Sequence, residues 1–407
     1  MVRNSILNVF FLAGLFFLND SLFSQEWFQW LGPYRNGISP DEGLIKSWSG
    51  NGPEIVWKDS IGDGFSSVTV TDGKAFCGWS EGEDEYLYCL DALTGKVVWN
   101  YRIGPLYRDD WGDGPRSSPV VDNEMVYIAG SYGNLHAVNR LTGEGIWNHD
   151  LVKEYGSLIP QWGYSCSPLI EQNMLLVDVG GTKNHAFMAF DKYSGKVIWN
   201  TYTDTLAWAS PIIADIQGQR QILFYNLNGL HSLSSENGEL LWQYRQRASN
   251  IPTPMFIPPD KVFISCSYNV GSTLLQIEKS DSSFKVNTIW KNKIMQNHFN
   301  SSVLVGDYLY GFDNAFLKCI DFKTGAQKWQ KVGLGKGSLI YADSMLIVLS
   351  ERGKLLLVKA DPEKYIEMAD FQALHGRCWT SPSLTNGHLF LRSREEIVCI
   401  NLNKSVN

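Results

Sequence analysis

The sequence has no concentration of positive charge and none of the short motifs that mark common catalytic centres. Its 35 Lys and Arg residues are outnumbered by 42 Asp and Glu residues, which gives a net charge of −7, and no basic run occurs. Because nucleic-acid binding needs clustered Lys and Arg to neutralise phosphates, nucleic acid is excluded as a partner. A Gly-rich phosphate loop, H-E-x-x-H and G-x-S-x-G are absent, and the seven His are dispersed. We therefore predict no catalytic residue and no metal ligand.

One acidic stretch, RDDWGDGPR (residues 108–116), carries Asp109, Asp110 and Asp113. It lacks the twelve-residue spacing and the terminal Glu of an EF-hand. Acidic segments that contain Gly are typical of turns, so we predict a solvated loop here.

No long hydrophobic run is present either. The one apolar run, Ile6 to Leu18, has 13 residues, follows Arg3 and precedes a small-residue position at Ser24. This run is too short to cross ~30 Å of hydrocarbon, and its flanks are those of a signal peptide. We predict a signal peptide over residues 1–24, an N-terminal extension over 25–53 and one folded domain over 54–407. No Cys near the cleavage point offers a lipid acceptor, so we expect a periplasmic or secreted protein without a membrane span.

Cysteine is scarce, and its number is odd. Seven Cys cannot all pair, and Cys89, Cys319 and Cys399 fall at a repeat position that Ala or Ser fills elsewhere. Such positions favour buried, unpaired thiols. The one pair that a hairpin register allows is Cys77 with Cys89, and the sequence leaves open whether they are bonded.

A short motif occurs five times instead. LDALTGKVVW ends at Trp99, and related segments end at Trp147, Trp199, Trp242 and Trp329. The spacing between aligned aromatic residues is about 45 residues, the period of a four-stranded propeller blade. A catalytic motif occurs once, so a motif repeated five times indicates architecture. We assign the five Trp to structural docking between blades, with the Gly of each motif in a turn that needs positive φ.

The blades can be counted from their first strands. Eight segments begin near Ser66, Ser117, Ser167, Ser210, Thr253, Ser301, Ser338 and Ser381. The last set has only three strands, and Glu54 to Asp59 is a fourth strand without a blade. Lending this strand to the last blade closes the ring and removes both free edges. The sequence therefore predicts an all-β, eight-bladed β-propeller closed by an N-terminal strand.

The segments that precede the first strands supply a candidate binding site, since topology brings them to one mouth of the channel. They carry Trp, Tyr, Arg and His side chains, which suit stacking on a ligand and forked hydrogen bonds to it. The predicted ligand- or partner-binding residues are Trp111, Arg116, Trp162, Tyr164, Trp208, His298, Arg377 and Trp379. The alternative is that the aromatic rings only fill the mouth and pack on one another.

The repeated A-x-D-x-x-T-G-x-x-x-W pattern resembles the tryptophan-docking motif of the pyrroloquinoline quinone (PQQ) repeat propellers. That family includes PQQ dehydrogenases and BamB-type outer-membrane assembly propellers. The segments Trp27 to Ser39 and Trp162 to Gly181 also resemble exported members of this family. The resemblance implies an eight-bladed propeller and leaves enzymes and scaffolds both open, because the motif is a packing device.

Features that the resemblance implies for a dehydrogenase are not matched. The chain has no adjacent Cys pair and no C-x-x-C-H, and oxygen donors for calcium such as Glu154, Asn300 and Asp113 are scattered. We therefore expect an exported, non-catalytic binding or scaffold protein of the cell envelope, without a cofactor, whose partner is a protein or a polysaccharide. The alternative is a PQQ-dependent quinoprotein oxidoreductase that holds PQQ with calcium in the channel.

Overall fold

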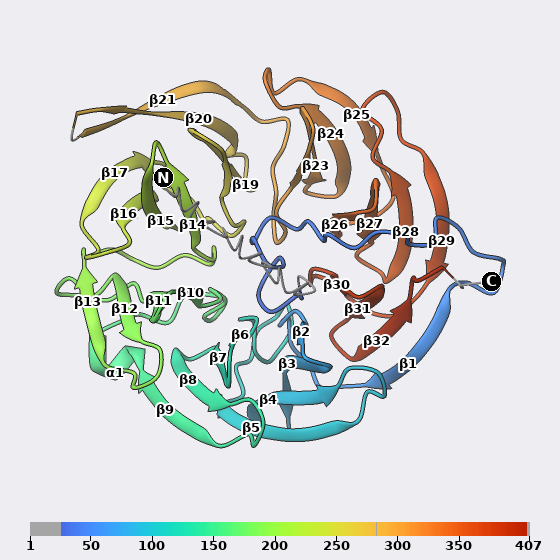
Figure 1. Ribbon diagram of the computed structural model, residues 1–407, viewed down its shortest axis with the longest axis horizontal. Helices are drawn as coiled ribbons and strands as arrows, with labels where there is room; N and C mark the ends of the chain where they lie inside the picture. The colour runs from blue at the N-terminus through green and yellow to red at the C-terminus, as the bar shows by residue number, and fades with distance from the viewer. Residues whose placement is uncertain (1–25, 282, 405–407) are drawn as a thin grey trace, which may run out of the picture.

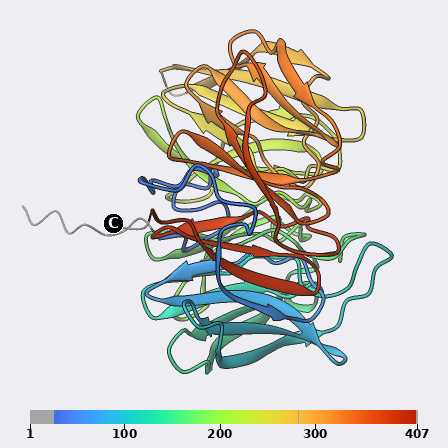
Figure 2. The same cartoon turned by 90° about the vertical axis from the view of Figure 1, so that its right-hand side faces the viewer.

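The computed structural model describes residues 26–281 and 283–404 and shows eight four-stranded antiparallel sheets arranged around a central axis (Figure 1). The predicted eight-bladed propeller is confirmed. The predicted signal peptide lies outside the described residues. Seen from the side, the ring is flattened, and the red last blade lies between the orange and the blue blades (Figure 2).

Each blade runs from an inner first strand to an outer fourth strand, except that the chain's first strand completes the last blade. Blades 1 and 2 comprise β2 (Thr69–Thr71), β3 (Lys74–Glu81), β4 (Asp84–Asp91), β5 (Val97–Pro105), β6 (Val120–Asp122), β7 (Met125–Ala129), β8 (Asn134–Asn139) and β9 (Gly145–Asp150). Blades 3 and 4 comprise β10 (Leu169–Glu171), β11 (Met174–Asp178), β12 (Phe187–Asp191), β13 (Val197–Thr201), β14 (Ile212–Ile216), β15 (Gln219–Asn226), β16 (Gly229–Ser234) and β17 (Leu240–Arg245). Blades 5 and 6 comprise β18 (Met255–Ile257), β19 (Lys261–Cys266), β20 (Gly271–Ser280), β21 (Ser283–Asn292), β22 (Val303–Val305), β23 (Tyr308–Asp313), β24 (Phe316–Asp321) and β25 (Gln327–Lys331). Blades 7 and 8 comprise β26 (Ser338–Ala342), β27 (Met345–Leu349), β28 (Lys354–Lys359), β29 (Glu367–Gln372), β30 (Ser383–Thr385), β31 (His388–Arg392), β32 (Glu396–Asn401) and β1 (Glu54–Ser60).

The ring closes as predicted. Strand β1 pairs antiparallel with β32, with Trp57 opposite Cys399, and Figure 1 shows the two strands side by side in this blade. The pairing removes the free edge that β32 would otherwise present.

The repeated motif explains how neighbouring blades adhere. The indole of Trp99 donates a 2.9 Å hydrogen bond to the carbonyl of Arg140 in the next blade, and a Cβ at Gly143 would lie 2.8 Å from its ring. Only Gly allows the indole to lie flat on the turn, whose positive φ also favours Gly. Trp57, Trp147, Trp290 and Trp329 donate in the same way to the blade that follows.

The two remaining motif tryptophans depart from this pattern. The ring of Trp199 lies on Gly238 of the next blade, but its Nε1 has no hydrogen-bond partner in the described chain. Trp242 donates a 2.8 Å hydrogen bond to Gln221 of its own blade. The Trp side chains thus share a position between blades, whereas their polar contacts differ.

The motif turns are held by side-chain acceptors. The carboxylates of Asp91, Asp191 and Asp321 each accept a hydrogen bond from the amide of the residue three positions later. Hydrogen bonds from Thr94 and Ser194 lower the pKa of Asp91 and Asp191. The turns are therefore stabilised by ionised carboxylates.

All seven cysteines are free and buried. In the β3–β4 hairpin, Phe76 lies opposite Cys89 and Cys77 lies opposite Tyr88. Because a one-residue offset turns a side chain to the other face of a sheet, Cys77 and Cys89 point to opposite sides and do not pair.

Candidate functional site

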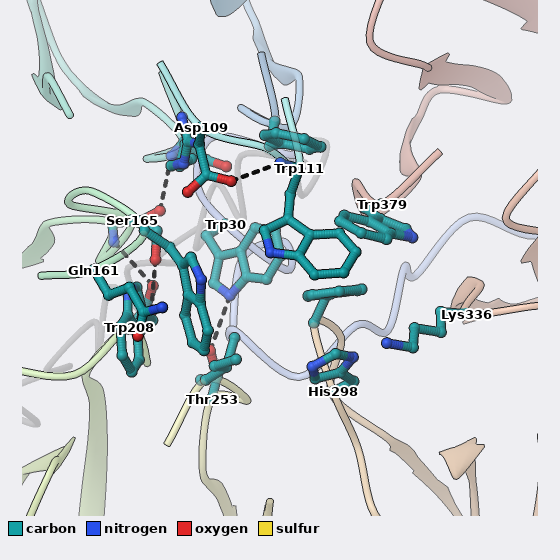
Figure 3. Close-up of a pocket in the computed structure, with 18 of the residues that line it drawn as sticks. Trp30, Asp109, Trp111, Gln161, Ser165, Trp208, Thr253, His298, Lys336 and Trp379 are labelled. Atoms are coloured by element: carbon teal, nitrogen blue, oxygen red, sulfur yellow. Dashed lines mark hydrogen bonds between the residues drawn. The ribbon is translucent and has the colours of Figure 1, made fainter. Parts of the chain in front are cut away.

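A pocket of about 420 Å³ lies at one mouth of the channel (Figure 3). Eight of the residues that line it carry large aromatic rings. The rings come from segments far apart in the sequence: Trp30, Phe65, Trp111, Trp162, Trp208, Tyr268, Phe299 and Trp379. We call this cavity the aromatic pocket.

The inner strands of blades 8, 1, 2, 3 and 4 are joined at the channel by hydrogen bonds from a main-chain amide to a Ser hydroxyl. The amide of Ser67 donates to the hydroxyl of Ser118, the amide of Ser118 to that of Ser167, and the amide of Ser167 to that of Ser210, each at 2.9 Å. The amide of Ser381 donates to the hydroxyl of Ser67 at 3.1 Å, which links blade 8 to blade 1. These bonds fix the inner strands relative to one another. The residue two positions before this Ser, or before its counterparts Thr253, Ser301 and Ser338, lines the pocket in all eight blades, namely Phe65, Arg116, Ser165, Trp208, Ile251, Phe299, Lys336 and Trp379.

Most of the predicted binding residues meet here. Six of the eight line the aromatic pocket: Trp111, Arg116, Trp162, Trp208, His298 and Trp379. Arg377 lies beside them, with its guanidinium 4.4 Å from the ring centre of Trp379. The structure thus brings together side chains from separate junctions between blades.

Tyr164 is the exception. It is 1% exposed, belongs to the hydrophobic core shared by blades 2 and 3, and lies within hydrogen-bond distance of Ser157 and the carbonyl of Val179. The prediction that it lines the mouth is wrong. Gly163, with φ +70°, makes the turn that separates Trp162 at the pocket from Tyr164 in the core.

The floor of the pocket comes from the N-terminal segment, residues 26–53, which lies across the centre of the ring (Figure 1). The indole of Trp30 donates a 2.9 Å hydrogen bond to the hydroxyl of Thr253 in blade 5. The carbonyl of Trp27 accepts from Val70 in blade 1, and Gly37 pairs with Tyr341 in blade 7. The channel is therefore filled below the pocket by chain that belongs to no blade.

Arg35 locks this segment in place. Its guanidinium is 4% exposed and donates to the carbonyls of Ser167, Pro168 and Pro211 in blades 3 and 4, as well as to the side chain of Gln29. Burial lowers the pKa of Arg35 to about 9, so the side chain is still a cation at neutral pH. Main-chain carbonyls pointing at the axis supply the acceptors that a buried guanidinium requires.

The aromatic walls form two groups. The rings of Trp162 and Trp208 lie 4.6 Å apart, and Trp162 stacks on Tyr268 at 6.1 Å with an interplanar angle of 13°. Across the pocket, Phe299 lies 4.1 Å from Trp379. The space between the groups is flanked by ring faces, which suits a flat apolar or sugar-like group.

The polar atoms of the lining are few. Arg116 donates to the carbonyls of Gly112 and Gly114, and its guanidinium lies 4.7 Å from the ring centre of Tyr107. Burial lowers the pKa of Arg116 and of Lys336. Arg116 thus supports the adjacent loop, and Lys336 is the cation left facing the cavity.

Two buried polar atoms of the lining residues have no partner in the described chain. Burial, with Lys336 nearby, lowers the pKa of His298 to about 3, so this imidazole is neutral at neutral pH. Its Nε2 lies 2.9 Å from the hydroxyl of Tyr268, whereas its Nδ1 has no hydrogen-bond partner in the described chain. The Nε1 of Trp208 has none there either. The described chain therefore leaves the hydrogen-bonding capacity of two buried lining atoms unused.

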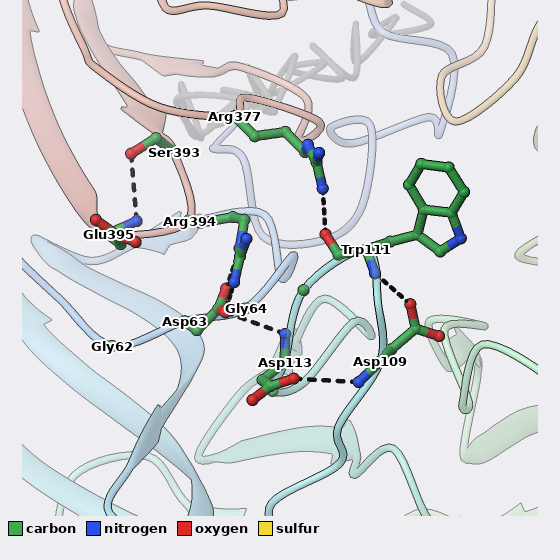
Figure 4. A network of polar contacts seen from close by, with 12 residues as sticks. Gly62, Asp63, Gly64, Asp109, Trp111, Asp113, Arg377, Ser393, Arg394 and Glu395 are labelled. Atoms are coloured by element: carbon green, nitrogen blue, oxygen red, sulfur yellow. Dashed lines mark hydrogen bonds and ion pairs between the residues drawn. The ribbon is translucent and has the colours of Figure 1, made fainter.

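Trp111, 53% exposed, is held over the pocket by a chain of polar contacts (Figure 4). Its amide donates to Asp109 at 2.7 Å, the amide of Asp109 donates to Asp113 at 3.1 Å, and the amide of Asp113 donates to Asp63 at 3.0 Å. Asp63 in turn pairs with Arg394 of the last blade. The acidic stretch predicted as a solvated loop is therefore an ordered support for Trp111.

The pKa of Asp63 reports on this support. Burial opposes ionisation of the carboxyl, but hydrogen bonds from Arg394 and from the amides of Asp113 and Gly64 outweigh it and lower the pKa. Arg377 completes the arrangement by donating to the carbonyl of Trp111.

The calcium donors that accompany PQQ in dehydrogenases are not assembled in the described residues. Glu154 accepts from the amide of Asp150, Asn300 donates to the carbonyl of Gly337, and Asp113 belongs to the loop network. Residues 26–281 and 283–404 contain no group of three His, Cys, Asp or Glu that could hold a metal. The residues present do not fit that metal site.

Several lining residues were not predicted. Phe65, Phe299 and Lys336 lie in the segments before first strands, as the predicted set does, so their positions carried a signal. Tyr268 lies in the loop between the second and third strands of blade 5, which reaches the same face of the ring. Trp30 lies in a segment without any repeat, and no sequence signal placed it at the axis.

No helix in the described part of the chain is long and apolar enough to cross a membrane. The one helix found there is α1 (Leu151–Tyr155), a single turn capped by Asp150.

Comparison with known proteins gives two groups of relatives. BamB of Yersinia pestis is 22% identical over 319 residues, covering 73% of this chain and 76% of that protein. Quinoprotein ethanol dehydrogenase of Pseudomonas putida is 21% identical over 215 residues, covering 47% of this chain. The aligned part spans about a third (32%) of that dehydrogenase.

Solved structures agree on the fold. BamB from Moraxella catarrhalis superposes with a TM-score of 0.64 at 14% identity, covering 87% of this chain and 99% of that one. Quinohemoprotein alcohol dehydrogenase from Pseudomonas putida HK5 also gives 0.64, at 12% identity, covering 94% and 81%. A family model described as "Outer membrane protein assembly factor BamB" matches residues 41–150 and 83–331. The chain therefore belongs to the PQQ-repeat propeller family represented by that BamB model.

Proposed function

We propose that this chain is an exported, non-catalytic propeller, located in the periplasm or secreted. It binds a protein partner of the cell envelope through the aromatic pocket. The observation that carries the proposal is a pocket walled by eight aromatic rings and closed beneath by the N-terminal segment. Aromatic side chains dominate binding hot spots because they bury large rigid area at low entropic cost.

The rim of the pocket favours a protein partner. Leu158 and Ile159, in the loop that leads to Trp162, are 68% and 41% exposed, and Tyr268 is 52% exposed. Exposed apolar side chains in the segments that line a pocket are typical of protein interfaces. A partner that inserts one apolar side chain would bury the rim together with the pocket. The kinship with an outer-membrane assembly factor supports the same class of partner.

A polysaccharide is the second candidate. The nearly parallel rings of Trp162 and Tyr268 give a flat face of the kind on which sugar rings stack. We assign recognition and no reaction, because Arg116 and Asp109 are already engaged by main-chain groups of the lining.

Photo-crosslinking tests the proposal. A photoreactive residue at Leu158 should capture an envelope protein, and the same residue at Leu141, which is 62% exposed in an outer turn, should not. Trp162→Ala should reduce capture at position 158 without lowering the melting temperature appreciably. Equal capture at both positions, or capture that survives Trp162→Ala, would contradict the proposal.

Two further measurements separate the alternatives. Binding of isolated envelope polysaccharide that is lost in Trp162→Ala would favour the carbohydrate candidate. Turnover with an artificial electron acceptor after reconstitution with PQQ and calcium would overturn the non-catalytic assignment.

A further inference from the structure

A second cavity, of about 400 Å³, lies between blades 3 and 4, away from the aromatic pocket. Its walls come from the segment that links the two blades (residues 202–204), the β15–β16 turn and the outer strand β17. Unlike the aromatic pocket, its lining is mainly polar. We call it the polar cleft.

The register of blade 4 explains which side chains face the cleft. His231 on β16 lies opposite Gln243 on β17, and Gly229 lies opposite Arg245. Alternate residues of a strand share a face, so Gln243 and Arg245 lie on the same side of β17. The ring of His231 lies 5.4 Å from Phe187 of blade 3, so this side faces the neighbouring blade.

Two arginines supply most of the charge of the cleft. Arg245 and Arg247 both line it and are exposed. Neither guanidinium forms a side-chain hydrogen bond or an ion pair within residues 26–281 and 283–404. Most other surface arginines in the described residues do have carboxylate partners, as Arg220 has in Glu171. Two unpaired forks on one cavity wall match the geometry of an oxyanion.

A buried polar atom lies in the same wall. The side chain of His231 is 3% exposed, and its Nδ1 has no hydrogen-bond partner in the described chain. Its Nε2 lies 3.7 Å from a carboxylate oxygen of Asp204. Burial lowers the pKa of His231, although Asp204 and the main chain of Gly229 act in the opposite direction. The side chain of His231 is therefore a buried part of the cleft wall.

The acidic groups nearby leave the cleft positive. Asp204 accepts hydrogen bonds from the amide of Thr205 and the side chain of Asn228, which occupy one of its oxygens. Burial and the proximity of Asp204 raise the pKa of Asp178, which does not line the cleft, well above its usual range. Two guanidinium groups therefore face one carboxylate.

We propose that the polar cleft binds a small oxyanion, a carboxylate or phosphate group, between Arg245, Arg247 and His231. The two guanidinium groups contact the anion, and His231 completes the inner wall. This site is separate from the aromatic pocket and does not depend on the function proposed for it.

Ligand relaxation measurements on the full folded protein test the proposal, because they detect weak binding. Inorganic phosphate is observed by phosphorus relaxation and succinate by proton saturation transfer. At least one of the two should bind the wild-type protein, and the one that binds identifies the oxyanion. In the double variant Arg245→Ala/Arg247→Ala, the affinity should fall by roughly tenfold or more, as loss of charge-assisted contacts predicts.

Matched variants exclude an effect of net charge. Arg102→Ala/Arg352→Ala removes two exposed arginines elsewhere and should leave the affinity unchanged. Asp204→Asn keeps an acceptor for Thr205 but removes the charge, so it should strengthen binding several-fold. Absence of binding by both anions, or equal losses in the two double variants, would overturn the proposal.

Discussion

The contact between Trp199 and Gly238 allows the energy of packing between two blades to be measured by substituting either residue. Trp199 is 8% exposed, and a Cβ at Gly238 would lie 2.5 Å from its Cε3. Trp199→Ala deletes a buried aromatic ring, so the free energy of unfolding should fall by ~3–5 kcal/mol. Gly238→Ala forces a methyl group against the ring, which costs ~1–3 kcal/mol. It also places Ala at φ +73°, which costs a further ~1–2 kcal/mol.

In the double variant the methyl group has room, so the steric part of the cost of Gly238→Ala disappears, whereas the cost of its positive φ and the cost of the lost Trp199 ring remain. The two substitutions should therefore be non-additive by ~1–3 kcal/mol. Gly73→Ala is the matched control, because Gly73 has φ +69° and an added methyl group there would meet no atom within 4 Å. Urea denaturation followed by circular dichroism measures all four variants. Additivity within ~0.5 kcal/mol would show that the indole does not rest on the glycine.

Buried groups and ring closure give three further expected outcomes. Burial raises the pKa of Cys166 to about 12, and all seven thiols are buried. Iodoacetamide should therefore modify no thiol in the folded protein and all seven after denaturation; rapid modification of the folded protein, detected by mass spectrometry, would contradict this. Asp59→Pro should disrupt the β1–β32 pairing, because Asp59 lies opposite Ile397 with its N–H directed at β32; it should lower the melting temperature and promote association, whereas Asp59→Ala should do so much less, and equal melting of the two would argue against closure by β1. The raised pKa of Asp178 means that the folded state holds this proton more tightly than the unfolded state, so the stability of the fold should decrease as the pH rises above about 4 towards that pKa. Asp178→Asn should flatten the dependence of the melting temperature on pH, and parallel melting-temperature curves for wild type and variant would refute this.

The architecture could be predicted because the sequence states it repeatedly. Each blade carries its own strand pattern and turn residues, and five copies carry the Trp motif, so an error in one copy is corrected by the others. Ring closure followed from counting strands, since Glu54 to Asp59 had no other partner. Position relative to the first strands also placed six candidate side chains at one mouth.

Features that occur once were harder to predict. The N-terminal segment is held at the axis by contacts that each occur once, such as Trp30 with Thr253 and Arg35 with Pro211. No repeat in the sequence predicts these contacts. The prediction for Tyr164 failed for a local reason, because one turn at Gly163 sends neighbouring aromatic residues in different directions. Cys77 and Cys89 do not pair because the strand register is offset by one residue from the one that would place them opposite each other.

The contrast between repeated and varied positions separates stability from recognition in this fold. Where blades adhere, the chain uses the same residue types repeatedly, since every junction has the same geometry. At the equally repeated position two residues before the Ser or Thr that opens each blade, the residue types instead differ from blade to blade: Phe65, Arg116, Ser165, Trp208, Ile251, Phe299, Lys336 and Trp379. A plug for a symmetric channel needs only bulk, which similar apolar side chains at each position would supply. A pocket that distinguishes one partner from another needs different groups at defined places. The irregular lining of a regular ring is therefore the physical argument that this mouth recognises a specific partner.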